Sequence, residues 1–107
     1  MGVFFFEDYA KHMWRYYLNS RYAVASMMSG VQLQNWIACD TVFNDLKQSE
    51  KDIMVAYGTG GAEAMPEYAK RNRIEQRAIW DVVNKALRMA AEERGLVERA
   101  DRREAGL

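Results

Sequence analysis

The chain has 107 residues and no net charge, and half of its residues are hydrophobic. This length and composition predict one domain with a modest core and exclude a disordered chain. The zero net charge argues against strong, non-specific binding to nucleic acid. The single cysteine, Cys39, excludes an internal disulfide and is typical of a protein from the reducing cytoplasm.

The first apolar segment predicts a helix over residues 5–28. Its aromatic and methionine side chains recur at spacings of three and four, which forms one broad apolar stripe. We expect Ser29-Gly30 to end this helix, with an alternative break near Asn19-Ser20. The apolar residues 3–6 run directly into Glu7 and Asp8, so neither a signal peptide nor a membrane span is expected here.

A second apolar side of the same helix carries Trp14, Tyr17 and Leu18. A helix that is apolar on two sides needs two neighbours. One interpretation is that the helix lies at the centre of the bundle. The other is that these three residues form a surface for a partner, for example in a two-fold homodimer.

The next two helices are expected over residues 33–47 and from Ser49 to the glycines at 58–61. Ser49 is the expected N-cap, with Asp52 as the acidic third residue after it. Trp36 is expected on the core side of the second helix. Residues 58–61 are expected to stop the third helix and to form a flexible loop.

The last two helices are predicted over residues 65–71 and 76–94. Pro66 suits a first helical turn, and Gly95 is the expected C-cap, followed by Leu96. We therefore expect an all-α, compact bundle of about five helices over residues 1–97. The remaining residues, 98–107, are expected to be a charged tail.

The segment around Ala69, Ile74 and Ile79 has the spacing of a helix-turn-helix, in which a small residue lies at the helix crossing and two aliphatic residues follow. Arg73 stands at the turn position that glycine usually occupies. Asn72 tolerates a positive φ, so the turn is expected to close one residue earlier. This segment resembles phage Cro-type repressors, which also have Ala-Lys at the crossing, Gln after the turn and Ala-Ile on the next helix.

The larger arrangement of a capped helix, a glycine segment, a short helix and a long helix over about residues 49–95 resembles region 4 of sigma factors. The whole chain is also similar to small uncharacterised proteins of clostridial mobile elements, through segments such as 9–13, 35–40 and 90–96. The first two resemblances imply a tri-helical helix-turn-helix that binds DNA. The resemblance to the proteins of clostridial mobile elements implies no particular activity.

Basic residues concentrate in this motif, since residues 70–88 hold six basic and two acidic residues, whereas residues 1–69 hold five and eight. A DNA-facing patch and a solvated helical face both have this composition. The leading hypothesis is a small DNA-binding transcriptional regulator of a phage or mobile element, acting on double-stranded DNA. The expected DNA contacts are Lys70, Arg71, Arg73, Gln76, Arg77, Asn84, Lys85 and Arg88.

The alternative hypothesis is a protein that binds and inhibits a host defence system, as anti-CRISPR proteins do. His12 is the only histidine, and with Cys39 alone it cannot form a metal site. The expected states are a partly exposed histidine and a buried structural thiol, rather than a nucleophile pair. The sequence therefore predicts no enzyme and no cofactor.

Overall fold

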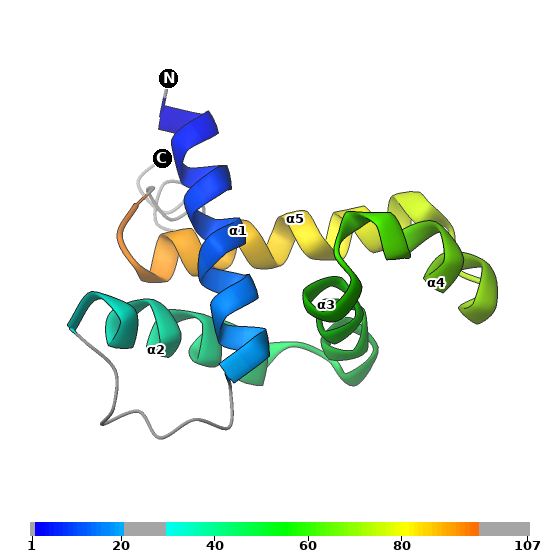
Figure 1. Cartoon of the computed structure of the whole chain (residues 1–107), viewed down its shortest axis with the longest axis horizontal. Coiled ribbons are helices and arrows are strands. Elements are labelled where there is room, and N and C mark those ends of the chain that lie inside the picture. Colours follow the sequence, from blue (N-terminus) through cyan, green and yellow to red (C-terminus); the bar gives the residue numbers. More distant parts are fainter. Residues whose placement is uncertain (1, 21–29, 97–107) are drawn as a thin grey trace, which may run out of the picture.

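The computed structural model describes residues 2–20 and 30–96, which form five α-helices and one 3₁₀ turn, without a strand (Figure 1). The predicted all-α fold is confirmed. None of the described helices combines the length and apolar character needed to cross a bilayer. The expectations for residues 21–28 and for the tail at 98–107 lie outside the described residues.

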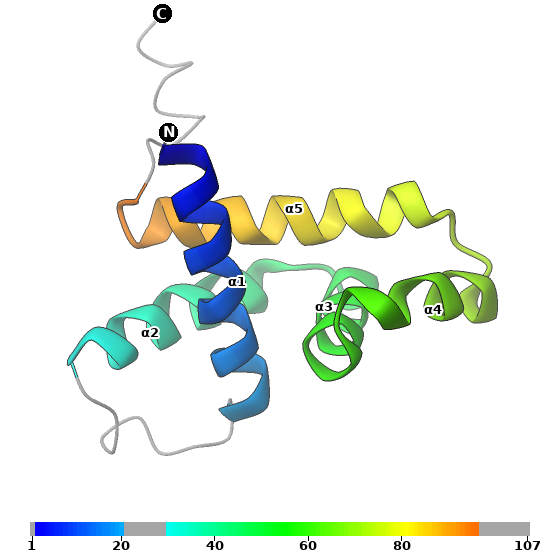
Figure 2. The ribbon, with the colours of Figure 1, turned by 45° about the horizontal axis from the view of Figure 1, so that its top comes forward.

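The elements follow one another with short connections after α2. Their bounds are α1 Gly2–Ser20, α2 Gly30–Asp45, α3 Gln48–Gly60, η2 Ala62–Ala64, α4 Met65–Asn72 and α5 Gln76–Glu93. In Figures 1 and 2, α1 crosses the long helix α5, while α3 and α4 lie toward the N-terminal end of α5. At the crossing, the indole Nε1 of Trp14 donates a hydrogen bond of 3.0 Å to the carbonyl oxygen of Ala86.

Helix α1 has more than one neighbour, because α2, α3 and α5 all pack against it. Trp14 is 0% exposed and Tyr17 is 2% exposed. The Tyr17 ring has its centroid 5.7 Å from that of Trp14, 5.3 Å from that of Trp36 and 5.8 Å from that of Phe43. Its hydroxyl donates to Oδ1 of Asp40 on α2 at 2.7 Å. These aromatic contacts join α1 to α2.

The surface expected from Trp14, Tyr17 and Leu18 is therefore covered by other helices of the same chain. Trp14 and Tyr17 are in the core, and Leu18 packs partly buried against it. The structure thus shows a helix whose second apolar side is covered by neighbouring helices. Trp36, expected in the core, is only partly buried at its edge.

Two local signals were misread. Gly30, expected between the first two helices, is the first residue of α2. Ser49 does not cap α3, because that helix begins at Gln48 with Lys47 as its N-cap. There the side chain of Glu50 accepts a 3.0 Å hydrogen bond from the Lys47 backbone N–H. The acidic residue that satisfies the helix start is therefore Glu50 rather than Asp52.

The glycine segment is helical up to Gly60, which corrects the expected flexible loop at 58–61. A Cβ atom placed on Gly58 would lie 2.6 Å from Cβ of Leu18, so α1 and α3 approach each other closely where this side chain is absent. Gly61 ends α3 with a φ of +73°, a conformation that favours glycine. These two glycines therefore serve packing and helix termination.

The expected signals at α4 and α5 are confirmed. Pro66 lies in the first turn of α4. Gly95 follows the end of α5 with a φ of +77°. The backbone N–H of Leu96 returns to the carbonyl oxygen of Ala91 at 2.8 Å, and that of Gly95 to Glu92 at 3.0 Å. This pair of bonds is the Schellman arrangement that glycine promotes after a helix.

Candidate nucleic-acid interface

Helix α4 and the start of α5 are held together by the three apolar positions that the sequence singled out. Ala69 is 4% exposed and Ile79 is 0% exposed, and Ile74 packs partly buried against the same core. Small and aliphatic residues at these positions let the two helices meet around a short turn. The side chains between them in the sequence are left outside, so the turn and its flanks face solvent.

The turn is closed by Arg73, not by Asn72. Arg73 has φ +57° and ψ +46°, and it is the only non-glycine residue with a positive φ among the described residues. The N–H of Ile74 bonds to the carbonyl oxygen of Ala69 at 2.9 Å, and that of Arg73 to Lys70 at 3.4 Å. Arg73 thus occupies the glycine position of the turn, where a side chain is destabilising.

Arg73→Gly is expected to stabilise the protein by about 0.5–1 kcal/mol, because the left-handed conformation costs glycine little although glycine gains entropy in the unfolded chain. The measurement is the midpoint and slope of urea denaturation. Arg71→Gly is the matched control, since Arg71 lies inside α4. That control is expected to destabilise by about 0.5–1 kcal/mol, and a loss of stability in both variants would contradict the turn geometry.

Helix α5 begins in solvent with its first backbone N–H groups uncapped by a side chain. Glu75 is the N-cap residue in extended conformation, and its side chain makes no capping hydrogen bond. Gln76, Arg77 and Ala78 of the first turn are all exposed. The N-terminus of a helix carries a partial positive charge and attracts phosphate oxygens.

Four basic residues lie in the last turn of α4, in the turn that follows and in the first turn of α5. They are Lys70, Arg71, Arg73 and Arg77, which we call the turn cations. All four are exposed. Within the described residues none of them forms an ion pair, because both ion pairs there involve other residues. Their charges are therefore directed to solvent and not neutralised inside the molecule.

The more distant predicted contacts differ from the turn cations. Arg77, Asn84, Lys85 and Arg88 share the outer face of α5, but Lys85 bonds Glu50 of α3 and Arg88 pairs with Glu92 at 3.4 Å. The hydrogen bond from Lys85 lowers the pKa of Glu50, and the Lys47 N–H adds to this effect. Glu50 therefore stays ionised and holds Lys85, and Asn84 remains exposed between the two pairs.

The sequence did not reveal the partner of Lys85. Glu50 lies 35 residues earlier, and only the packing of α3 on α5 brings them together. The pair of Arg88 with Glu92 has a local signal, since residues four apart on a helix are neighbours. The structure thus separates the turn cations from the more neutral remainder of the α5 face.

The groups considered for other chemistry have the expected environments. Cys39 is fully buried, and burial, with a contribution from Asp40, raises the pKa of its thiol well above the usual range. The thiol therefore stays protonated and is a weak nucleophile. His12 is exposed on α1. In the described part of the chain, no three histidine, cysteine or carboxylate side chains are grouped as a metal site requires.

Comparison with models of protein families, with characterised proteins and with solved structures finds no match to this chain.

Proposed function

We propose that the chain is a small DNA-binding regulator that docks the start of α5 on double-stranded DNA. The observation that carries this proposal is the cluster of turn cations around an uncapped helix N-terminus. Phosphate contacts of this kind position a protein on DNA, and side chains at the start of the inserted helix reach base edges. A source in a phage or mobile element, with transcription as the process regulated, belongs to the same proposal.

The kind of DNA contact assigned to each side chain follows from its position. Lys70, Arg71 and Arg73 come from α4 and the turn, beside the helix start, and they suit phosphate contacts. Gln76 and Arg77 are the first two residues of α5 and suit adenine and guanine edges respectively. Asn84, Lys85 and Arg88 follow along the outer face, where Lys85 and Arg88 would exchange their internal carboxylate partners for DNA.

The strained backbone at Arg73 supports the same assignment. Glycine would fit this turn at lower cost, so the arginine side chain is retained at the expense of stability. Residues that store backbone strain cluster at binding sites. Arg73→Gly is thus expected to separate two properties, raising the stability of the protein while weakening its binding to DNA.

Arg77→Ala is expected to reduce the binding free energy by about 1–3 kcal/mol on a selected DNA site and by less on random duplex, as the loss of a base contact does. Lys70→Gln is expected to weaken binding to all DNA sequences alike. It is also expected to lower the slope of log K against log salt by about 1, as the loss of a phosphate contact does. The site is first selected from a random duplex library. Fluorescence anisotropy at several salt concentrations then gives the affinities.

Lys51→Gln removes the same charge outside the turn, where Lys51 lies over the Phe43 ring, and serves as the control. Its affinity is expected to match that of the unmodified protein. The absence of duplex binding at low salt would contradict the proposal and favour a protein-directed inhibitor. Equal losses from Arg77→Ala on selected and random DNA would contradict the base contact alone.

A further inference from the structure

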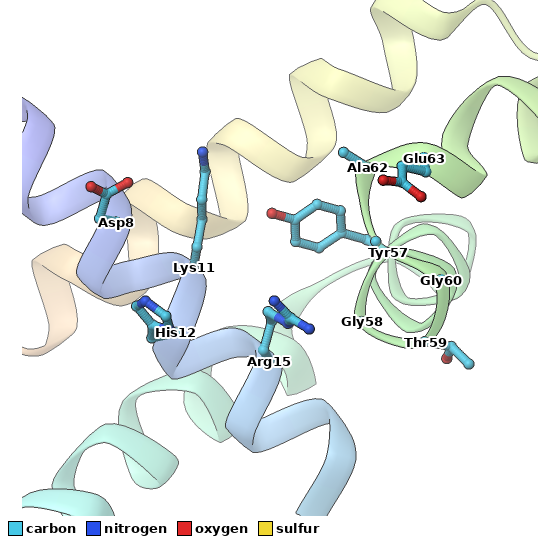
Figure 3. Close-up of a pocket in the computed structure, with 11 residues that line it drawn as sticks. Asp8, Lys11, His12, Arg15, Tyr57, Gly58, Thr59, Gly60, Ala62 and Glu63 are labelled. Carbon is cyan, nitrogen blue, oxygen red and sulfur yellow. The ribbon is translucent and has the colours of Figure 1, made fainter.

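A cleft of about 520 Å³ lies between α1 and the glycine-rich end of α3. One wall is a single face of α1, where Asp8, Lys11, His12 and Arg15 follow at spacings of three and four. The other wall is the segment 57–63, from the last turns of α3 into η2 (Figure 3). Binding sites for metabolites typically enclose about 300–1,000 Å³, so the cleft is large enough for one.

The two permanent cations of the α1 wall, Lys11 and Arg15, are exposed. Within the described residues neither forms an ion pair, although the carboxylates of Asp8 and Glu63 line the same cleft. Each wall thus carries a carboxylate, and the α1 wall also carries both cations. An anion bound beside Lys11 and Arg15 would pair with two cations that form no ion pair among the described residues.

Tyr57 supplies a neutral donor between the walls. Figure 3 shows its hydroxyl pointing from α3 toward α1, between Lys11 and Arg15. Burial raises the pKa of Tyr57, and the positive charge of Arg15 only partly opposes this effect. The hydroxyl therefore remains protonated at neutral pH and can donate a hydrogen bond. The ring is held in place by its edge contact with Trp80, with centroids 6.1 Å apart.

The opposite wall of the cleft lacks a side chain at Gly61. Gly61 has no atom within 4 Å of the position that a Cβ would take, so this part of the wall is open. Gly58 and Gly60 also line the cleft, but the positions that a Cβ would take there lie against Leu18 and Ala64 and do not face open space. At Gly61 a ligand can therefore approach the backbone closely while Lys11 and Arg15 reach it from the other side.

We infer that this cleft binds a small organic anion, one with a phosphate or carboxylate group and also hydroxyl or amino groups. Lys11 and Arg15 bind the anionic group, and the Tyr57 hydroxyl donates to one of its oxygens. Asp8 and Glu63 accept hydrogen bonds from the hydroxyl or amino groups. The volume and the carboxylates both favour such a ligand over inorganic phosphate. The site uses none of the residues assigned to DNA, so it is independent of the proposed function.

The test is titration of the ¹⁵N-labelled protein with AMP, glucose 6-phosphate, glutamate and inorganic phosphate. Glycine amides are well separated in a ¹H–¹⁵N spectrum. We expect at least one organic probe to shift the signals of Gly58, Gly60 and Gly61 in a saturable manner. The signals of Gly30 and Gly95 lie outside the cleft lining and are expected to stay in place.

Lys11→Gln and Arg15→Gln are each expected to weaken that binding by about tenfold or more, the size of one charge-assisted hydrogen bond. Lys47→Gln removes a charge outside the cleft and is expected to bind as the unmodified protein does. Three outcomes would overturn the inference: no saturable shift with any organic probe, equal affinity for inorganic phosphate, or unchanged binding in both cleft variants. No DNA is present, so a failure here leaves the proposed function untouched.

Discussion

Trp14→Ala is expected to lower the free energy of unfolding by about 3–5 kcal/mol, the cost of removing a large aromatic side chain from a core. Trp14 is completely buried where α1 crosses α5. Its removal leaves a cavity, removes the ring contact with Tyr17 and removes the donor to the Ala86 carbonyl. Since a small domain has only about 5–15 kcal/mol in total, this change removes much of its stability.

Chemical denaturation followed by circular dichroism measures this effect. Trp14→Phe keeps an aromatic ring and loses the indole N–H, so a smaller loss of about 1–3 kcal/mol is expected, and this variant stays measurable if the alanine variant does not fold. Trp36→Ala is the matched comparison because Trp36 is only partly buried. A larger loss at Trp36 than at Trp14 would contradict the complete burial of Trp14 where α1 crosses α5.

The sequence placed Trp36 in the core and left the position of Trp14 open between two interpretations, so it did not predict this ranking. Trp36 lies on the apolar stripe of its helix, whereas Trp14 lies beside the main stripe of α1. A stripe indicates which side of a helix faces one neighbour. It does not indicate how many neighbours a helix has. Because α1 is covered by three helices, its second apolar side is buried as well.

Single residues predicted helix ends correctly where their effect is a property of their own backbone. Pro66 and Gly95 marked the start of α4 and the end of α5, because a missing N–H and a positive φ are local properties. Gly58 misled for the opposite reason. Glycine is tolerated inside a helix, and at Gly58 the demand for it comes from α1, about forty residues away in the chain.

The candidate interface was predictable in part. The spacing of Ala69, Ile74 and Ile79 correctly indicated which residues are shielded around the turn, and therefore which basic residues lie outside. The residue with the positive φ could not be predicted correctly, because the propensity for this conformation is higher for Asn72 than for Arg73. The cleft beside Tyr57 was not predicted at all, since its two walls come from distant segments.

Gly58→Val is expected to destabilise the protein by about 3 kcal/mol, at the upper end of the cost of overpacking. A Cβ at this position would lie 2.5 Å from Cδ1 and 2.6 Å from Cβ of Leu18. The Leu18 Cβ is fixed to its backbone and cannot rotate away, so the whole of α3 must move from α1. Gly58→Ala has the same clash but gains about 1 kcal/mol of helix propensity, so a smaller loss is expected.

Gly30→Val is the matched control for Gly58→Val, because Gly30 is also helical but a Cβ there meets no atom within 4 Å. Its change in stability is expected to stay within about 0.5 kcal/mol, as for other surface substitutions. Urea denaturation of the three variants gives the comparison. Equal stability of Gly58→Val and Gly30→Val would refute the close approach of α1 and α3. A selective loss at Gly58 would show that this glycine is required by helix packing, whatever the cleft beside it binds.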